Sequence, residues 1–248
     1  MKIPIVIKIG TGVLTRENGT LDGASLVRLV TAVAELKAAG HACVMVSSGA
    51  VGAGVSSLNL TAYPDDVETR QAAAAIGQAR LMQRYQTLFE QFDLDVAQLL
   101  LTGSDLKDHR ERVCSTMRRL LKEGDIIPIV NENDSVAIEE LRVGDNDMLS
   151  AGVAEMLGAR QLILFTTVDG LLDDDDKLIA HVDDLAAVSG MVRSGSGKFS
   201  IGGMASKLQA VKYATESGIE VLVANGRKPA QILELVDGGG VCTRFGCR

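Results

Sequence analysis

Short apolar runs alternate with amphipathic helical patterns along nearly the whole chain, and this alternation constrains the fold more than any other feature. Six runs predict buried strands, at residues 3–9, 42–46, 96–101, 126–130, 161–166 and 220–223. Helical spacing of apolar residues occupies the segments between them, at residues 26–36, 67–92, 106–122, 145–157, 203–216 and 230–236. Strands that are apolar on both faces and separated by helices are typical of a mostly parallel sheet covered by helices on both sides.

The repeated strand–helix order favours a doubly wound αβα sandwich. A closed α/β barrel of eight strands is the alternative, because about 250 residues is also typical of that fold. The 248 residues contain no internal repeat and no recognisable domain linker, so we expect a single domain over residues 1–248. Hydrophobic residues make up 46% of the chain but aromatic residues only 3%, so the core is expected to consist of Ala, Val, Leu and Ile.

Charge and composition exclude several classes of protein. The net charge of −7 argues against a nucleic-acid partner that requires a broad basic surface, but a small anionic ligand needs only a few local lysines. No apolar run reaches the roughly 18 residues of a membrane span, and the start of the chain lacks a signal-peptide pattern. The four cysteines lack zinc-site spacing and are interpreted as reduced thiols. We therefore expect a cytoplasmic protein without a membrane partner.

Two glycine-rich segments directly follow predicted strands, at the carboxyl ends where open α/β sheets bind ligands. Lys8 lies near the end of the first strand and is followed by Gly10 and Gly12, which allow backbone N–H groups to approach a phosphate. Residues 47–54 (SSGAVGAG) follow the second strand, and their small side chains open a helix that could bind an anion. A tight turn and close helix–strand packing are the respective alternatives.

Two further segments carry more polar residues than turns require. Residues 131–134 (NEND) and 144–147 (GDND) together contain seven polar side chains, whereas a cap for the following helix would need one. Asn and Asp can hold an ammonium group, orient a carboxylate or bind Mg²⁺ through water. Lys207 lies in the first turn of a helix opened by Gly202 and Gly203, where a cation opposes the helix dipole unless an anion lies between them.

Other chemistries lack their sequence patterns. The three histidines show no metal-binding spacing, and no G-x-S-x-G nucleophile motif is present. The glycine order in residues 47–54 matches neither the Walker A loop nor the dinucleotide fingerprint. A phosphate or carboxylate site is therefore favoured over a hydrolase or dehydrogenase site.

Taken together, these segments resemble the amino acid kinase family, and within it the glutamate kinases. The matching stretches run in family order through the chain, at residues 8–15, 47–54, 131–136, 143–151 and 202–210. The resemblance implies a three-layer αβα sandwich with a mostly parallel eight-stranded sheet. It also implies transfer of the ATP γ-phosphoryl group to the side-chain carboxylate of L-glutamate, with Mg²⁺, as the first step of proline biosynthesis.

The resemblance also implies a role for individual residues. The catalytic residues would be Lys8, Lys207 and Asp147. Glutamate would be bound by Ser48, Gly49, Ala50, Asp134 and Asn146. ATP would be bound by Lys8, Thr166, Thr167, Ile201, Gly202, Gly203, Met204, Ala205, Ser206 and Lys207. No residue is assigned as a metal ligand. The acceptor carboxylate is already ionised at neutral pH, which agrees with the lack of a candidate general base.

Two residues depart from the family pattern in the nucleotide segment. Thr167 replaces an acidic residue and Leu172 replaces an aromatic one, so we expect effects on nucleotide affinity and selectivity rather than on phosphoryl transfer. The chain also looks like a single-domain form, without the C-terminal domain of RNA-modifying type that many bacterial members carry. The family further suggests a homo-oligomer (dimer or tetramer), feedback inhibition by L-proline, and glutamyl-phosphate reductase as a possible partner.

Two alternative functions stay open. Another family acceptor, such as N-acetylglutamate, aspartate, carbamate or UMP, is disfavoured by the NEND and GDND segments. A non-catalytic sensor of nucleotide or amino acid is disfavoured by the retention of Lys8, Lys207 and Asp147, since binding alone does not require all three.

Overall fold

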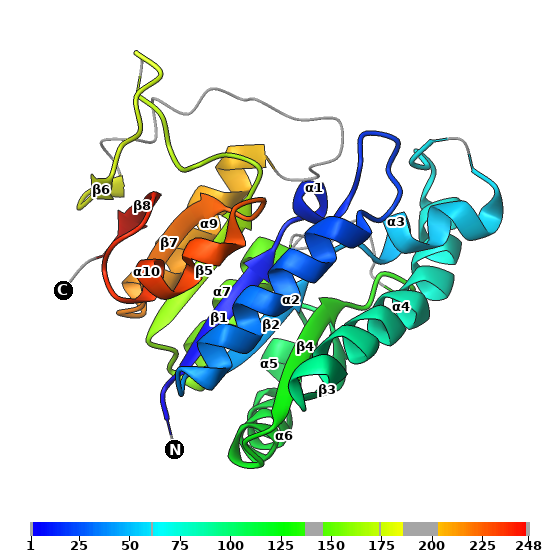
Figure 1. The fold of residues 1–248 in the computed structure, drawn as a ribbon, viewed down its shortest axis with the longest axis horizontal. Coiled ribbons are helices and arrows are strands. Elements are labelled where there is room, and N and C mark those ends of the chain that lie inside the picture. Colours follow the sequence, from blue (N-terminus) through cyan, green and yellow to red (C-terminus); the bar gives the residue numbers. More distant parts are fainter. Residues whose placement is uncertain (1, 61, 137–145, 174, 186–202, 247–248) are drawn as a thin grey trace.

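The strands of the computed structural model form one mostly parallel sheet (Figure 1). The structure describes residues 2–60, 62–136, 146–173, 175–185 and 203–246. In those residues the strand order is β3-β4-β2-β1-β5-β7-β8-β6, with β8 antiparallel to β7. The strands are β1 (Pro4–Ile9), β2 (Ala42–Ser47), β3 (Asp95–Leu101), β4 (Ile126–Glu132), β5 (Gln161–Thr166), β6 (His181–Val182), β7 (Glu220–Asn225) and β8 (Cys242–Phe245).

Helices cover both faces of this sheet. They are α1 (Thr11–Leu14), α2 (Gly23–Ala38), α3 (Ala50–Val55), α4 (Val67–Phe89), α5 (Asp105–Asp108), α6 (Arg110–Lys122), α7 (Asn146–Leu157), α9 (Gly203–Glu216) and α10 (Ile232–Val236). One hydrophobic cluster joins the sheet to α2, α4 and α10, and a second joins its other face to α6, α7 and α9. The predicted three-layer sandwich is confirmed. The closed-barrel alternative is wrong, because β3 and β6 are the two edges of an open sheet.

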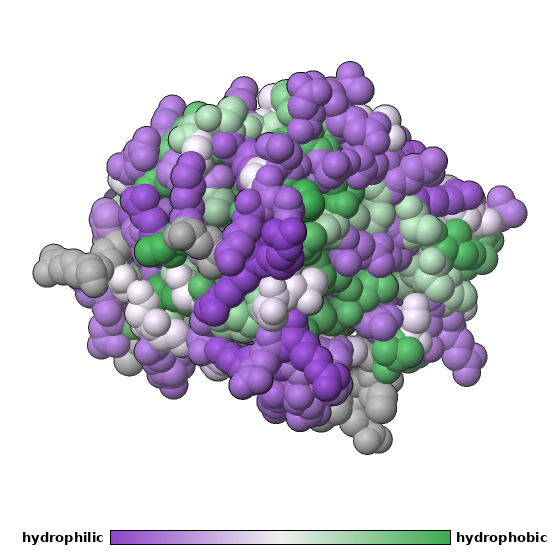
Figure 2. All heavy atoms as spheres, turned by 90° about the horizontal axis from the view of Figure 1, so that it is seen from below, coloured by the Kyte–Doolittle hydropathy of each residue, from purple (hydrophilic) through white to green (hydrophobic). Residues whose placement is uncertain are grey.

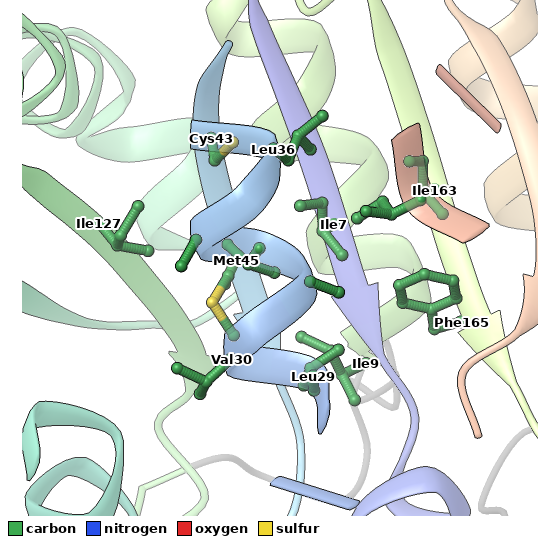
Figure 3. Close-up of a cluster of buried hydrophobic side chains, with 14 of the residues drawn as sticks. Ile7, Ile9, Leu29, Val30, Leu36, Cys43, Met45, Ile127, Ile163 and Phe165 are labelled. Carbon is green, nitrogen blue, oxygen red and sulfur yellow. The ribbon is translucent and has the colours of Figure 1, made fainter. Parts of the chain in front are cut away.

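The core around β1 shows how the apolar pattern produces this layering (Figure 3). Ile7 and Ile9 point toward α2, which packs on the sheet through Leu29, Val30 and Leu36. All five side chains are at most 1% exposed. Because successive side chains of a strand face opposite sides, the residue between Ile7 and Ile9 must face the other layer. That residue is Lys8, and its position in the sequence therefore directs it toward α7 and α9.

The structure differs from the sequence-based expectations at three places. The helix expected over 106–122 is divided at His109, whose φ of −120° and ψ of 17° are not helical. A short 3₁₀ helix, Pro229–Gln231, forms the start of the helix expected at 230–236. The strands β6 and β8 were not predicted, because β6 has two residues and β8 includes buried Thr243 and Arg244. Polar residues in a buried strand remove the apolar signal that strand prediction depends on.

The outer faces of the helices are mostly hydrophilic. Seen from below the view of Figure 1, hydrophobic residues occur in patches between hydrophilic ones (Figure 2). Among the described residues, no helix combines the length and the apolar character that crossing a membrane would require.

Candidate active site

Two buried lysines share one buried carboxylate at the carboxyl end of β1. Lys8 comes from β1, Asp147 from the first turn of α7 and Lys207 from α9, and the three are 3%, 0% and 7% exposed. Nζ of Lys8 lies 2.5 Å from Oδ1 of Asp147, and Nζ of Lys207 lies 3.1 Å from its Oδ2. Each carboxylate oxygen therefore holds one ammonium group, and both lysines are fixed in position by the same residue.

The charges in this triad keep Asp147 ionised. Burial alone would raise the pKa of this carboxyl, but the positive charges of Lys8 and Lys207 outweigh burial and lower it below its usual value. Two ammonium groups and one carboxylate leave one net positive charge at the end of the strand. A buried charge of this kind is costly unless an anion approaches it, so the triad is suited to a phosphoryl group.

A cavity of about 250 Å³ extends from the triad over the carboxyl ends of the strands. On one side it is lined by Lys8, Lys207, Gly10, Gly12 and Thr166. Gly12 permits a close approach of Thr167, the residue that follows β5, because a Cβ at Gly12 would lie 3.0 Å from Cγ2 of Thr167. The predicted glycine-rich turn after β1 is therefore a wall of the cavity, where its small residues leave space beside the two lysines.

The opposite side of the cavity carries uncharged hydrogen-bonding groups and the carboxylates of Asp134 and Glu132. Ser48, Asn131 and Asn146 supply the uncharged groups, and Nδ2 of Asn146 donates to Oγ of Ser48 at 2.9 Å. Ser48 lies between the end of β2 and α3, where Gly49 adopts a φ of +103° that favours glycine. The turn brings Ser48 beside a residue that is 98 positions away in the sequence.

Asp134 differs from Asp147 in having little compensating charge. Burial raises the pKa of Asp134 to about 6, and the positive charge of Arg70 opposes this only in part. Tyr63 also lines the cavity, and burial, followed by the negative charge of Asp134, raises the pKa of Tyr63 to about 12. A cation placed beside Asp134 would therefore stabilise its ionised carboxylate, whose charge Arg70 compensates only in part.

The structure gathers most of the predicted site residues around this one cavity. Its lining includes Lys8, Ser48, Gly49, Ala50, Asp134, Asn146, Thr166, Thr167 and Lys207. Asp147 lies beneath it, in contact with both lysines. Ile201 and Gly202 fall outside the described residues, as do the side chains of Gly203, Met204 and Ala205. Ser206 is half-buried in the first turn of α9, and Leu172 is exposed on a loop. The roles assigned to these residues stay predictions.

Several cavity residues were not predicted from the sequence. Arg16, Tyr63 and Arg227 also line the cavity, and Nη2 of Arg227 donates to the carbonyl oxygen of Gly12 at 3.2 Å. Arg227 follows the end of β7, so its position after a strand and beside Gly226 was a usable signal. Arg16 and Tyr63 lie in loops with no distinctive pattern, and only the folded arrangement identifies them.

The fold and this arrangement of charges define a kinase of the amino-acid type. The chain belongs to the amino acid kinase family, whose profile matches residues 4–225. Among solved structures, carbamate kinase from Giardia lamblia bound to AMP-PNP superposes with a TM-score of 0.67 at 12% identity, covering 98% of each chain. At that identity the likeness shows the shared fold.

Curated relatives with higher identity are glutamate 5-kinases. The glutamate 5-kinase of Symbiobacterium thermophilum is 42% identical over 252 residues, covering 97% of this chain and 95% of that protein. The glutamate 5-kinase of Caldanaerobacter subterraneus subsp. tengcongensis is 40% identical over 250 residues, covering 97% of this chain and 67% of that protein.

Proposed function

We propose that this protein is an ATP-dependent kinase that phosphorylates the side-chain carboxylate of L-glutamate and forms L-glutamyl 5-phosphate, the first step of proline biosynthesis. The observation that carries the proposal is one cavity with two different ends. Two lysines share Asp147 at one end, called the transfer end below. Asp134 and Glu132 lie with uncharged hydrogen-bonding groups at the other, called the acceptor end. An acceptor with a carboxylate and an ammonium group matches both ends. The similarity to glutamate 5-kinases over nearly the whole chain supports the same substrate.

The chain's residues act at the transfer end by charge and position. The acceptor carboxylate oxygen attacks the γ-phosphorus of ATP as the bond to the bridging oxygen breaks, and ADP leaves with that electron pair. Lys8 and Lys207 neutralise the two anions that must approach each other and stabilise the charge that develops between them. Asp147 is not required as a base, since the acceptor is already ionised; it holds both ammonium groups in position.

ATP and Mg²⁺ fit the residues that line the transfer end. ATP supplies the phosphoryl group, and Lys8, Lys207 and Thr166 with the turn at Gly10–Gly12 would hold its phosphates. Among the described residues, no group of three His, Cys, Asp or Glu side chains is arranged to bind a metal ion. Mg²⁺ would therefore enter with ATP and be bound chiefly by the phosphates.

The acceptor end would orient glutamate. Asp134 would pair with the α-ammonium group, because a cation there relieves the cost that raises the pKa of this buried carboxyl. Ser48, Asn146 and the backbone at Gly49 and Ala50 would bind the carboxylates of the substrate. The distinct ends hold glutamate in one direction, with its side chain toward the lysines.

Further expectations belong to the same proposal. Residues 1–248 would form one kinase domain, which is supported by the single sheet that joins the described strands from β1 to β8. The enzyme would be cytoplasmic and homo-oligomeric, L-proline would inhibit it by competing for the acceptor end, and glutamyl-phosphate reductase would consume its product. These expectations rest on the family resemblance.

The test is ADP release with Mg·ATP and a panel of acceptors, with hydroxylamine added to trap an acyl phosphate. The panel contains L-glutamate, L-aspartate, N-acetyl-L-glutamate, carbamate and UMP. We expect ADP to form with L-glutamate together with an equal amount of the hydroxamate. Activity with another acceptor would reject the roles given to Asp134 and Asn146, and binding of ATP without turnover would favour a sensor.

A further inference from the structure

The helix α4 lies beneath the acceptor end and holds the loop that contains Ser48. Its backbone packs directly on α3: a Cβ at Gly77 would collide with the carbonyl oxygen of Ala50, and one at Gly54 with the carbonyl oxygen of Ala73. No ordinary side chain fits between the two helices at these points. The position of α3, and of the turn that precedes it, is therefore set by α4.

The buried face of α4 is apolar except for two side chains, Gln78 and Tyr85. These residues are seven positions apart, so they lie on the same side of the helix. Each contacts a polar residue at the carboxyl end of a strand. Oε1 of Gln78 accepts a hydrogen bond from Nδ2 of Asn131 in β4 at 2.8 Å, and the hydroxyl of Tyr85 lies 2.7 Å from Oγ of Ser47 in β2.

Hydrogen bonds continue from Gln78 to the substrate cavity. Oδ1 of Asn131 accepts from the backbone N–H of Glu132 at 2.9 Å and from Nδ2 of Asn146 at 3.0 Å. Nδ2 of Asn146 also donates to Oγ of Ser48 at 2.9 Å. The side chains of Gln78, Asn131, Asn146 and Ser48 come from four separate segments of the polypeptide. They are thereby joined into one hydrogen-bond chain that ends in the cavity at Ser48.

The donor–acceptor direction of these hydrogen bonds is fixed at the two inner residues, Asn131 and Asn146. A backbone N–H can only donate, and the N–H of Glu132 lies 2.9 Å from Oδ1 of Asn131 and 3.3 Å from Oδ1 of Asn146, which orients the oxygens of both amides toward it. The nitrogen of Asn131 then points at Gln78, whose oxygen is the acceptor that it needs. With this polarity Ser48 accepts from Asn146. Among the described residues the hydroxyl proton of Ser48 has no acceptor, so it is available to a hydrogen-bond acceptor in the cavity such as a carboxylate oxygen.

Burial of the Gln78 amide lowers the stability of the protein unless its side-chain oxygen is needed as a hydrogen-bond acceptor. The side chain is 9% exposed, and among the described residues its Nε2 has no hydrogen-bond partner. An apolar residue would avoid this unsatisfied donor. Asn131, however, is 1% exposed, and without Oε1 of Gln78 its amide nitrogen would be the unsatisfied group.

We propose that Gln78 is a positioning residue for the acceptor: through Asn131 and Asn146 it fixes Ser48 as a hydrogen-bond donor to a carboxylate oxygen of the substrate. The inference rests on the proposed glutamate kinase activity. It predicts that Gln78 affects binding of the acceptor and leaves the transfer end unchanged, because Lys8, Asp147 and Lys207 take no part in the hydrogen-bond chain.

The test compares two buried glutamines, one in α4 beside the carboxyl end of β4 and one at the amino end of β5. Gln161 is 2% exposed at the start of β5, where its Nε2 donates to Glu220 at 2.6 Å, away from the cavity. We expect Gln78→Leu to raise the glutamate KM roughly tenfold, the change that corresponds to one lost hydrogen bond. Its kcat and ATP KM should stay within about twofold. Gln161→Leu should lower the melting temperature and leave the glutamate KM unchanged.

Gln78→Glu supplies the rescue, because it retains an oxygen that accepts from Asn131. We expect its glutamate KM to lie much closer to wild type than that of Gln78→Leu. If Gln78→Leu does not fold, Gln78→Met, with an unbranched side chain of similar length, takes its place. An unchanged glutamate KM in the apolar variant, or an equal fall in kcat and ATP affinity, would overturn the inference. A wild-type enzyme that turns over no carboxylate acceptor would instead overturn the proposed function, and the inference with it.

Discussion

The two ends of the cavity each contain a buried or half-buried aspartate, but their surroundings move the two pKa values in opposite directions. Asp147, with a lysine on each oxygen, has a lowered pKa. Burial raises the pKa of Asp134 to about 6, and only Arg70 offsets it. The carboxylate of Asp147 is thus compensated by two lysines, which leaves the transfer end one positive charge for an anion, whereas the carboxylate of Asp134 needs a cation. This difference predicts that the transfer end determines kcat and that the acceptor end determines the glutamate KM.

Removing a lysine from the transfer end should have the largest effect. We expect Lys207→Ala to lower kcat roughly 10²–10³-fold, the range found when one group that stabilises transition-state charge is removed. The glutamate KM should change by only a fewfold, because Lys207 acts mainly on charge that develops during transfer. Steady-state kinetics with ATP and glutamate varied separately would measure both parameters.

The matched control is Lys212→Ala on the same helix. Lys212 is exposed and lies 3.8 Å from Glu216, so its loss should leave both parameters near wild type. If Lys207→Ala raised the glutamate KM with no change in kcat, the division of labour between the two ends would be wrong.

Removing the carboxylate of Asp134 at the acceptor end should have the next largest effect, and this effect should appear in the glutamate KM rather than in kcat. We expect Asp134→Ala to raise the glutamate KM roughly 30-fold or more, because breaking a desolvated, hydrogen-bonded charge pair costs on the order of 2–5 kcal/mol. The kcat at saturating glutamate should stay within about threefold. Initial rates over a wide range of glutamate concentrations would separate the two. An unchanged KM would remove Asp134 from the substrate site.

The difference between the two aspartates should also appear in the pH dependence. The α-ammonium of glutamate pairs only with the ionised form of Asp134, which predominates above its pKa of about 6. We therefore expect kcat/KM for glutamate to fall about tenfold per pH unit below pH 6. Bound substrate favours the ionised form, so the corresponding decline in kcat should begin at lower pH. Asp147 should add no decline near pH 6, since its pKa is lowered.

Asp134→Asn is the control for this profile. It lacks the titrating carboxyl, so its kcat/KM, although lower throughout, should lose the step near pH 6. A step that persists in this variant would show that another group controls the pH dependence.

The same two ends show what could be predicted from the sequence. Lys8 lies between Ile7 and Ile9, so the alternation of the first strand already directs it away from the layer that those residues pack against. The polar segments at 131–134 and 144–147 exceed what turns require, and Asn131, Asp134 and Asn146 from them line the end of the cavity to which we propose that glutamate binds. Their assignment to individual substrate groups came from the family resemblance.

The burial of Gln78 and Arg244 could not be predicted from the sequence, and the physical reason is the same for both. Each is a polar residue that becomes buried by pairing with groups far away in the chain. Gln78 lies in a long helix in which Gln and Arg normally face solvent, and its partner Asn131 is 53 residues away. Arg244 is 5% exposed and bonds to the carbonyl oxygens of Leu235 and Gly239, so the strand that contains it lacks an apolar pattern. Single-sequence patterns report average burial by residue type and miss these exceptions.

The smallest predicted effect concerns Thr167, the departure from the family pattern that lines the transfer end. Its Cγ2 faces Gly12, whose carbonyl oxygen accepts from Arg227, so a carboxylate at position 167 would lie close to that guanidinium, beside the proposed ATP site. We expect Thr167→Asp to lower the ATP KM about threefold through one added hydrogen bond, and to leave kcat and the glutamate KM unchanged. Thr167→Asn, which lacks the charge, separates the hydrogen bond from electrostatics. Assays with ATP and GTP in parallel would measure both affinity and selectivity. A change in the glutamate KM instead would show that the two ends of the cavity are coupled. That result would contradict the separate roles that we infer from the opposite pKa shifts of Asp147 and Asp134.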